Sequence, residues 1–250
     1  MIARNSWIAA AILCIVIACA FATRAAGAEE KRTLNVVVVT GGHGYDEKAF
    51  PKLFAGHDDV KITMARQKED SELFEDISDW KYDVIVFYHM TQKISPKRQA
   101  NFQRLLENGV GVVALHHSIG AFQNWPEYAK IVGGKYLLSE MEIDGVKYAP
   151  STYKEGLEFK VQISAPDHPI MRGVKDFAIE DETYKGQWID PKATVLMTTD
   201  APTSDKALGW AKTYAKSRVC LLVIGHGPAI FTNENYQRMV YQAIRWSAEK

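Results

Sequence analysis

The histidines of this 250-residue chain are its best candidates for chemistry, because most of them follow apolar, strand-like runs. His43 lies in "GGHGYD" after "TLNVVVVT", and His89 ends "VIVFYH". His116 and His117 follow "VVAL", and His226 follows "VCLLVIG". Because parallel strands bring their carboxyl ends to one edge of a sheet, these five side chains should share one crevice. Imidazole acts as a general acid–base group and as a metal ligand, so both chemistries are expected there.

An acidic run could add a carboxylate to this crevice. The segment "AIEDETY" contains Glu180, Asp181 and Glu182 just before Tyr184. Such a run is most often a solvated turn. A single carboxylate beside the histidines would still be enough for a general base or a metal ligand, and we take Glu182 as that residue.

Neighbouring residues on an extended chain point in opposite directions, so only one member of the pair His116 and His117 should face the crevice. We favour His116. A divalent ion such as Zn or Mn is expected at His43, His116 and His226, since ligation by histidine without thiolates suits these metals. The local zinc motif H-E-x-x-H is absent, so no single motif demands a metal.

Nucleophilic catalysis has weaker support. Ser118 follows the two histidines, but "HHSIG" matches the nucleophile motif G-x-S-x-G only at Gly120, so a serine hydrolase is the weaker alternative. Cys14 and Cys19 lie in the N-terminal apolar segment, and Cys220 lies inside a strand-like run. This excludes an internal disulfide and a thiolate zinc site in the mature chain. No nucleotide cofactor is expected, because G-x-G-x-x-G and the P-loop pattern are absent.

The N-terminus has the pattern of a secretory signal. Residues 1–28 combine an arginine, the apolar run "SWIAAAILCIVIACAFA" and the small-residue site "AAGA", which predicts a secreted or periplasmic protein. "VIAC" also resembles a lipoprotein box with lipidation at Cys19, and an uncleaved membrane anchor is a further alternative. Thirty basic residues balance thirty acidic ones, which argues against a nucleic-acid partner.

The remaining residues, 29–250, alternate strand-like and helix-like segments. "SPKRQANFQRLLENG" begins with Ser-Pro and ends with Gly, as a helix does. This alternation predicts an α/β domain with a doubly wound, mostly parallel sheet and an irregular insertion around 121–190. Strands are expected over 33–40, 60–66, 82–88, 110–116, 158–164, 193–199 and 217–225, and helices over 95–109 and 233–250.

Several of these stretches resemble the ThuA-like (trehalose utilisation) family over about residues 33–247. They include "VVVVTGGHGYDEKAF", "GVGVVALHHSIGAFQNWPEYAKIVGGKY", "PDHPIMRGVKDFAIEDETY" and "VCLLVIGHGP". The resemblance implies a flavodoxin-like fold of the class I glutamine amidotransferase-like superfamily. In amidotransferases the turn after the corresponding strand carries a catalytic cysteine. Here that turn reads "LHHSIG", so the protein should not be a glutamine amidotransferase.

The resemblance also implies a role in the breakdown of disaccharides, including routes through 3-keto sugars. It places the family's shared polar positions on His43, His116, His117, Glu182 and His226. We therefore expect an exported enzyme that acts on glycosides or 3-keto-sugars by acid–base chemistry, with or without a metal. Its catalytic residues would be His116, His117 and Glu182, and its substrate-binding residues His43, Tyr45, Trp125 and Tyr184.

A non-catalytic module that binds or senses a sugar is the alternative. The expected partner is in either case a small-molecule sugar, and assembly into a homo-oligomer is left open.

Overall fold

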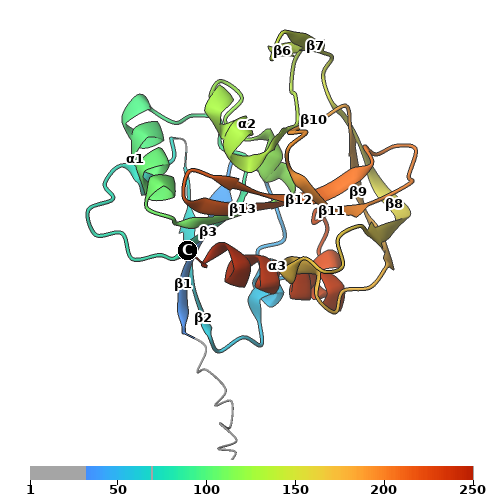
Figure 1. Cartoon of the computed structure of the whole chain (residues 1–250), viewed down its shortest axis with the longest axis horizontal. Coiled ribbons are helices and arrows are strands. Elements are labelled where there is room, and N and C mark those ends of the chain that lie inside the picture. Colours follow the sequence, from blue (N-terminus) through green and yellow to red (C-terminus); the bar gives the residue numbers. More distant parts are fainter. Residues whose placement is uncertain (1–31, 69, 250) are drawn as a thin grey trace, which may run out of the picture. The chain divides into compact units, whose positions relative to one another are not determined.

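The computed structural model describes residues 32–68 and 70–249, and a nine-stranded sheet lies at the centre of this part (Figure 1). The expected signal segment, including Cys19, lies outside the described residues. In spatial order, the strands are β2 (Val60–Arg66), β1 (Leu34–Gly41), β3 (Val84–His89), β4 (Gly111–Leu115), β13 (Ser217–Leu222), β12 (Ala207–Tyr214), β11 (Thr194–Thr198), β8 (Thr152–Ile163) and β9 (Phe177–Lys185).

The first five strands in this order are parallel, and helices cover both of their faces. Side chains alternate across a strand, so Val36 and Val38 pack on the side of α3 (Glu234–Ser247). Val37 and Val39 pack on the side of α1 (Pro96–Glu107) and α2 (Pro126–Val132). Burial on both faces explains why these strands are continuous β-branched runs. The predicted flavodoxin-like α/β fold is confirmed.

The other four strands extend the sheet in antiparallel fashion. Two of them, β9 and β12, are absent from the expected elements, because the acidic run in β9 and the polar residues near the end of β12 masked the strand pattern. The segment 121–190, which we expected to be an irregular insertion, carries part of this antiparallel extension. That segment contains α2, β9 and the twelve-residue strand β8.

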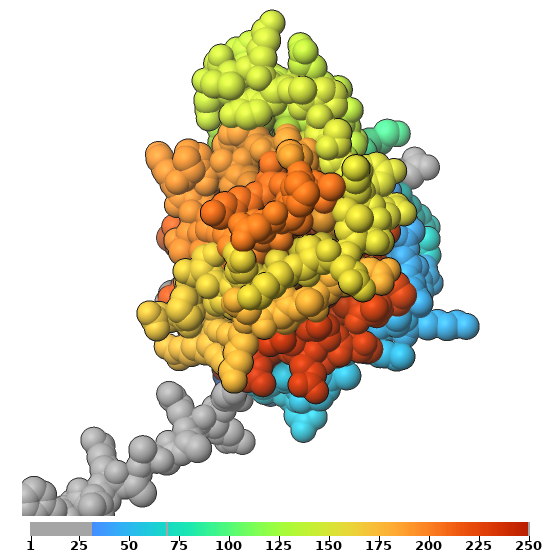
Figure 2. Space-filling view, turned by 90° about the vertical axis from the view of Figure 1, so that its right-hand side faces the viewer, coloured from blue at the N-terminus to red at the C-terminus, as the bar shows by residue number. Residues whose placement is uncertain are grey.

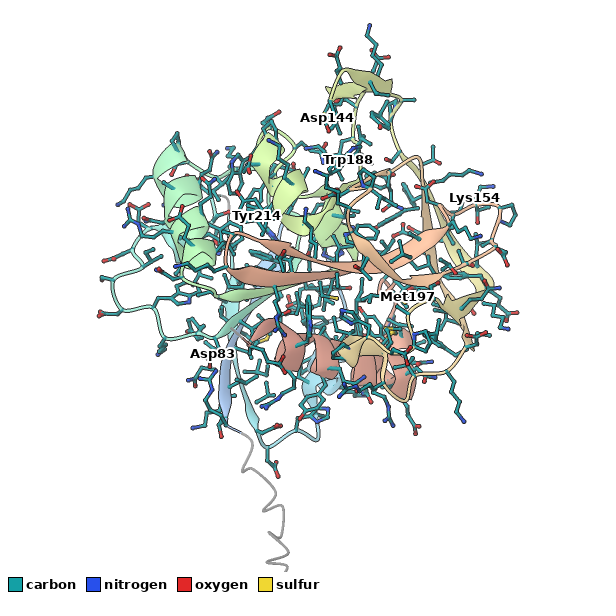
Figure 3. All side chains as sticks on the ribbon, in the orientation of Figure 1. Asp83, Asp144, Lys154, Trp188, Met197 and Tyr214 are labelled. Atoms are coloured by element: carbon teal, nitrogen blue, oxygen red, sulfur yellow. The ribbon has the colours of Figure 1, made fainter. Side chains whose placement is uncertain are left out.

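The short elements complete the described chain. The strands β5 (Gly134–Lys135) and β10 (Trp188–Ile189) pair with each other, and β6 (Met141–Ile143) with β7 (Val146–Tyr148) forms a hairpin. Figure 3 shows Asp144 on this hairpin and Trp188 below it. In Figure 2 the hairpin stands above the face formed by β8 and its neighbours. No helix in the described residues is long and apolar enough to cross a membrane.

The 3-10 helices are η1 (Phe50–Phe54), η2 (Glu72–Phe74), η3 (His116–Gly120), η4 (Pro169–Met171) and η5 (Ile230–Thr232). Of these, η3 follows β4 directly and carries the double histidine.

Candidate functional site

A cavity of about 210 Å³ opens where the carboxyl ends of the parallel strands meet β8 and β9. This is the edge at which the strand-end histidines were expected to gather. The lining combines imidazoles, carboxylates and tyrosines with a few apolar residues. Its members are His43, Met90, His117, Ile119, Gly120, Tyr136, Leu138, Tyr153, Glu155, Glu182, Tyr184 and His226.

His116 is fully buried behind the cavity lining, against Glu182 and Tyr184, and its backbone is in the left-handed region with φ of 46°. A non-glycine residue there costs about 1–2 kcal/mol, so the surrounding contacts must hold the turn in place. Its Nδ1 lies 2.7 Å from the carbonyl oxygen of Val223, which can only accept a hydrogen bond. Nδ1 therefore carries the proton, and the lone pair of Nε2 faces the site.

Two oxygen atoms lie 2.9 Å from the Nε2 atom of His116: Oε2 of Glu182 and Oη of Tyr184. A neutral imidazole with its proton on Nδ1 has no hydrogen to give to Glu182. The contact between Nε2 and the carboxylate therefore requires a second proton or a cation between the two groups. Burial raises the pKa of Glu182, but the hydrogen bond from His116 and the neighbouring His116 and His226 lower it overall.

One ligand atom each from His116, Glu182 and His226 lie within 4.8 Å of one another, which is a geometry that could hold a metal ion. Two imidazoles and one carboxylate suit several divalent transition metals. Metal-bound histidines usually donate their other N–H to a backbone carbonyl or a carboxylate. His116 makes this second contact with Val223, so the residues present fit an ion.

Asp181 positions the loop that carries His226. Its buried carboxylate accepts the backbone N–H groups of Gly225 at 2.6 Å, His226 at 3.0 Å and Gly227 at 3.4 Å. Gly225 has φ of 129°, and a Cβ there would lie 2.3 Å from Oη of Tyr236, so a larger residue does not fit. Sequence reasoning missed Asp181. Its signal was present as a second acid beside Glu182, together with three successive N–H groups in "GHG".

Of the adjacent pair, His117 lines the cavity, whereas His116, the member that we favoured, is not among the lining residues. The chain turns into η3 at His116, so the two side chains do not alternate as they would on a strand. Neither ring nitrogen of His117 has a hydrogen-bond partner within the described part of the chain. Burial, together with the nearby His116 and His43, holds its pKa well below the usual value.

His43 lies at the exposed side of the site, where its ring stacks on that of His117 with centroids 4.4 Å apart. Its Nδ1 donates to the carbonyl of Gly44 at 2.7 Å. The ring centroid is 6.0 Å from that of His226, but His43 does not belong to the three-ligand cluster. Glu182 takes the place that the metal prediction gave to His43.

Tyr184 contributes to the cavity wall, as expected, and burial followed by the charge of Glu182 raises the pKa of its hydroxyl. Two other expected substrate-binding residues do not line the cavity. Tyr45 packs edge-on against Tyr88, with ring centroids 5.5 Å apart. Trp125 lies in the hydrophobic core beside Phe102, because the indole belongs to the apolar side of α2. The assignments of Tyr45 and Trp125 to the cavity are therefore corrected.

Three further candidates are structural. The Oγ of Ser118 accepts the backbone N–H of His89, and its buried side chain does not line the cavity, so the serine hydrolase alternative loses its basis. His89 points into an aromatic part of the core, where its ring lies 4.6 Å from that of Phe87. Cys220 is a free thiol inside β13, and burial raises its pKa.

The parallel strands, the cavity at their carboxyl ends and the buried histidine at the turn define a glutamine amidotransferase-like protein without the amidotransferase thiol. The chain belongs to the ThuA family: the family model described as "Trehalose utilisation" matches residues 35–247. Membership of this family points to a carbohydrate-related function.

Solved structures share the fold at low identity. A ThuA-like protein from Parabacteroides merdae has a TM-score of 0.71 and 16% identity, with 87% of this chain and 90% of that chain covered. A ThuA-like protein from Bacteroides uniformis has a TM-score of 0.61 and 18% identity, with coverage of 87% and 92%. A cytoplasmic protein from Salmonella typhimurium has a TM-score of 0.58 and 14% identity, with coverage of 87% and 100%. No curated protein matches this chain.

Proposed function

We propose that the protein is an exported enzyme that acts on glycosides or 3-keto-sugars, with a divalent ion such as Zn or Mn held by His116, Glu182 and His226. The observation that carries the proposal is the contact of the His116 Nε2 lone pair with the Glu182 carboxylate at 2.9 Å. The family's carbohydrate-related function supplies the substrate class. The segment 1–28 supplies the expectation of export.

The spacing of the candidate ligands is compatible with an ion: Nε2 of His116 and Oε2 of Glu182 are 2.9 Å apart, and the three ligand atoms lie within 4.8 Å of one another. Ligand atoms about 3 Å apart are typical neighbours around an ion bound at roughly 2.0–2.2 Å. The Val223 carbonyl fixes the tautomer of His116 that leaves Nε2 free. The Tyr184 hydroxyl hydrogen-bonds the same carboxylate, which would orient Glu182 toward the ion.

We assign proton abstraction to His117, because its ring lines the cavity and lacks a protein partner in the described residues. Its low pKa keeps the ring unprotonated but makes it a weak base, so the substrate C–H must be acidified for the transfer to occur. In a 3-keto-glycoside the C2–H bond is acidified by the adjacent ketone. Transfer of that proton to His117 would form the C1–C2 double bond and break the bond from C1 to the glycosidic oxygen. The released oxygen takes up one proton and leaves as an alcohol, so the elimination needs no oxidant or reductant. An ion near His116 would polarise the ketone.

Metal content and turnover test the proposal together. The purified protein should contain stoichiometric Zn or Mn, and His116→Ala and Glu182→Gln should lose it. The control His57→Ala alters a histidine that stacks on Tyr241 away from the cavity, and it should keep the metal.

With 3-keto-glycosides as substrates, His117→Ala should retain the ion but lose roughly 10²–10⁴-fold in turnover. Equal rates for wild type, His116→Ala and His117→Ala would refute the site. Sugar binding without turnover in any metal-loaded form would instead favour the non-catalytic sugar-binding or sensing module.

A further inference from the structure

The rim of the cavity carries exposed apolar side chains. The described residues contain four exposed large hydrophobic side chains, and two of them, Leu138 at 50% and Tyr153 at 57% exposure, line this cavity. Single exposed hydrophobic residues are common on protein surfaces, but two at the mouth of one polar cavity form a specific surface.

Tyr153 continues the aromatic wall that begins at the base of the site. It pairs directly with Tyr184 across the β8–β9 ladder, and residues opposite each other in an antiparallel pair share a face. Tyr184 is 6% exposed and reaches His116, while Tyr136 lies between base and rim with its ring centroid 4.8 Å from that of Tyr184. The wall therefore runs from the buried ligands to solvent. Its outer end lies near Lys154, at the right of Figure 3.

The charge of the lining limits what can bind. Among the described residues the lining contains two carboxylates, Glu155 and Glu182, and no lysine or arginine. Glu155 follows Lys154 at the irregularity of the β8–β9 ladder, where its carboxylate can accept hydrogen bonds from hydroxyl groups. Glu182 faces the histidines and the proposed ion, whereas Glu155 at the rim has no lysine or arginine beside it among the described lining residues. A phosphate or carboxylate on the outer ring would meet the charge of Glu155, so the rim suits an uncharged, hydroxyl-bearing ring.

We propose that Leu138, Tyr153 and Glu155 form a second subsite, which binds the leaving-group ring of a neutral disaccharide while the reacting ring lies beside His117. This inference rests on the proposed function. The cavity volume of about 210 Å³ is below the roughly 300–1,000 Å³ of typical ligand pockets, so it suits a single ring. The second ring of a disaccharide would then extend from the cavity toward solvent, with its apolar face against the exposed side of Tyr153.

Two substrates can distinguish an effect on binding at the second subsite from an effect on the reaction itself. A 3-keto-disaccharide and the corresponding methyl 3-keto-glycoside share the reacting ring and differ only in the leaving group. Tyr153→Ala should lower kcat/KM for the disaccharide about tenfold more than for the methyl glycoside, as expected for the loss of one aromatic contact to the second ring. Tyr153→Phe should keep the selectivity. Val146→Ala removes another exposed hydrophobic side chain, on the β6–β7 hairpin, and is the matched control.

Each outcome bears on one proposal. If Tyr153→Ala changes both substrates equally or neither, the subsite is refuted while the reaction stands. If wild type converts neither substrate, the proposed function fails, and calorimetric titration with the two compounds decides the subsite. Tighter binding of the disaccharide that disappears in Tyr153→Ala would support the subsite, and equal affinities would overturn it. A 6-phosphorylated disaccharide that binds as tightly as the neutral one would also contradict it.

Discussion

Replacement of Asp181 by asparagine tests how the site is held together. The carboxylate is 4% exposed and accepts the N–H groups of Gly225 at 2.6 Å and His226 at 3.0 Å, one on each oxygen. Asparagine has nearly the same shape, but one of its oxygens is replaced by an NH₂ group, which cannot accept a hydrogen bond. In Asp181→Asn, one of the two backbone N–H groups therefore faces the NH₂ group of the side chain, and two donors cannot form a hydrogen bond.

The free-energy cost can be worked from these contacts. A hydrogen bond to a charged group contributes about 1.5–3 kcal/mol, and a buried N–H left without a partner costs about 1–3 kcal/mol. The amide oxygen of the Asp181→Asn variant would keep one hydrogen bond to the loop, but a bond between neutral groups contributes less free energy than one to a carboxylate. Relief from burying the charge offsets part of the loss. The net destabilisation should be about 3 kcal/mol, a large share of the roughly 5–15 kcal/mol that stabilises a typical domain.

Urea unfolding measures this change. With a slope of about 2–3 kcal/mol per molar urea, the midpoint of Asp181→Asn should fall by roughly 1–1.5 M. Glu180→Gln is the matched control, because Glu180 precedes Asp181 on the same strand and is exposed, so its effect should stay within about 0.5 kcal/mol. Affinity for Zn or Mn should fall only in Asp181→Asn, since His226 loses its fixed position. Equal urea midpoints for the two variants would refute this account of Asp181.

Two buried ionisable side chains should make the free energy of unfolding depend on pH, His89 in acid and Lys135 in base. Burial lowers the pKa of His89 from 6.5 to about 3, so stability should fall by up to about 5 kcal/mol as pH drops from 6.5 toward 3. His89→Leu should remove this slope in urea titrations at several pH values, and an unchanged slope would contradict it. Burial lowers the pKa of Lys135 from 10.5 to about 8, so the unfolded chain alone binds the proton between these values. Stability should therefore rise by about 3 kcal/mol from pH 8 to 10.5, and a similar rise in Lys135→Met would show that another group is responsible.

The parallel half of the sheet could be predicted because its signal is local. The strands β1, β3, β4 and β13 are buried on both faces, and this burial appears in the sequence as continuous apolar runs. The strand β9 could not be found in this way. Its acidic residues favour a turn by local preference. They are stable in a strand because distant groups contact their carboxylates: the backbone N–H groups of the loop at 225–227 donate to Asp181, and His116 contacts Glu182.

In the site, likewise, the positions of the residues could be predicted from the sequence, but the directions of their side chains could not. The rule that parallel strands bring their carboxyl ends together predicted that five histidines share one crevice. The structure places His43, His117 and His226 in the cavity lining, and His116 lies behind it with its ring centroid 5.1 Å from that of His226. The rule does not give the direction of each side chain. His89 is the last residue of β3, and its side chain turns into the core. The alternation rule assumes that the strand continues through His116 and His117. The strand instead ends before His116, where η3 begins, and His117 faces the cavity.

The antiparallel extension explains why a fold whose relatives place a nucleophile at this turn can hold a different site here. Among the lining residues that follow the parallel strands, the ionisable side chains are the imidazoles of His43, His117 and His226. The strand β9 brings a carboxylate from across the cavity to Nε2 of His116, and the preceding acid holds the loop of His226. The histidine at the turn is thereby fixed on both ring nitrogens, by Val223 on one side and by Glu182 and Tyr184 on the other. A nucleophile must be free to attack, whereas both ring nitrogens of His116 are held by these contacts, which is the arrangement that the proposed metal site requires.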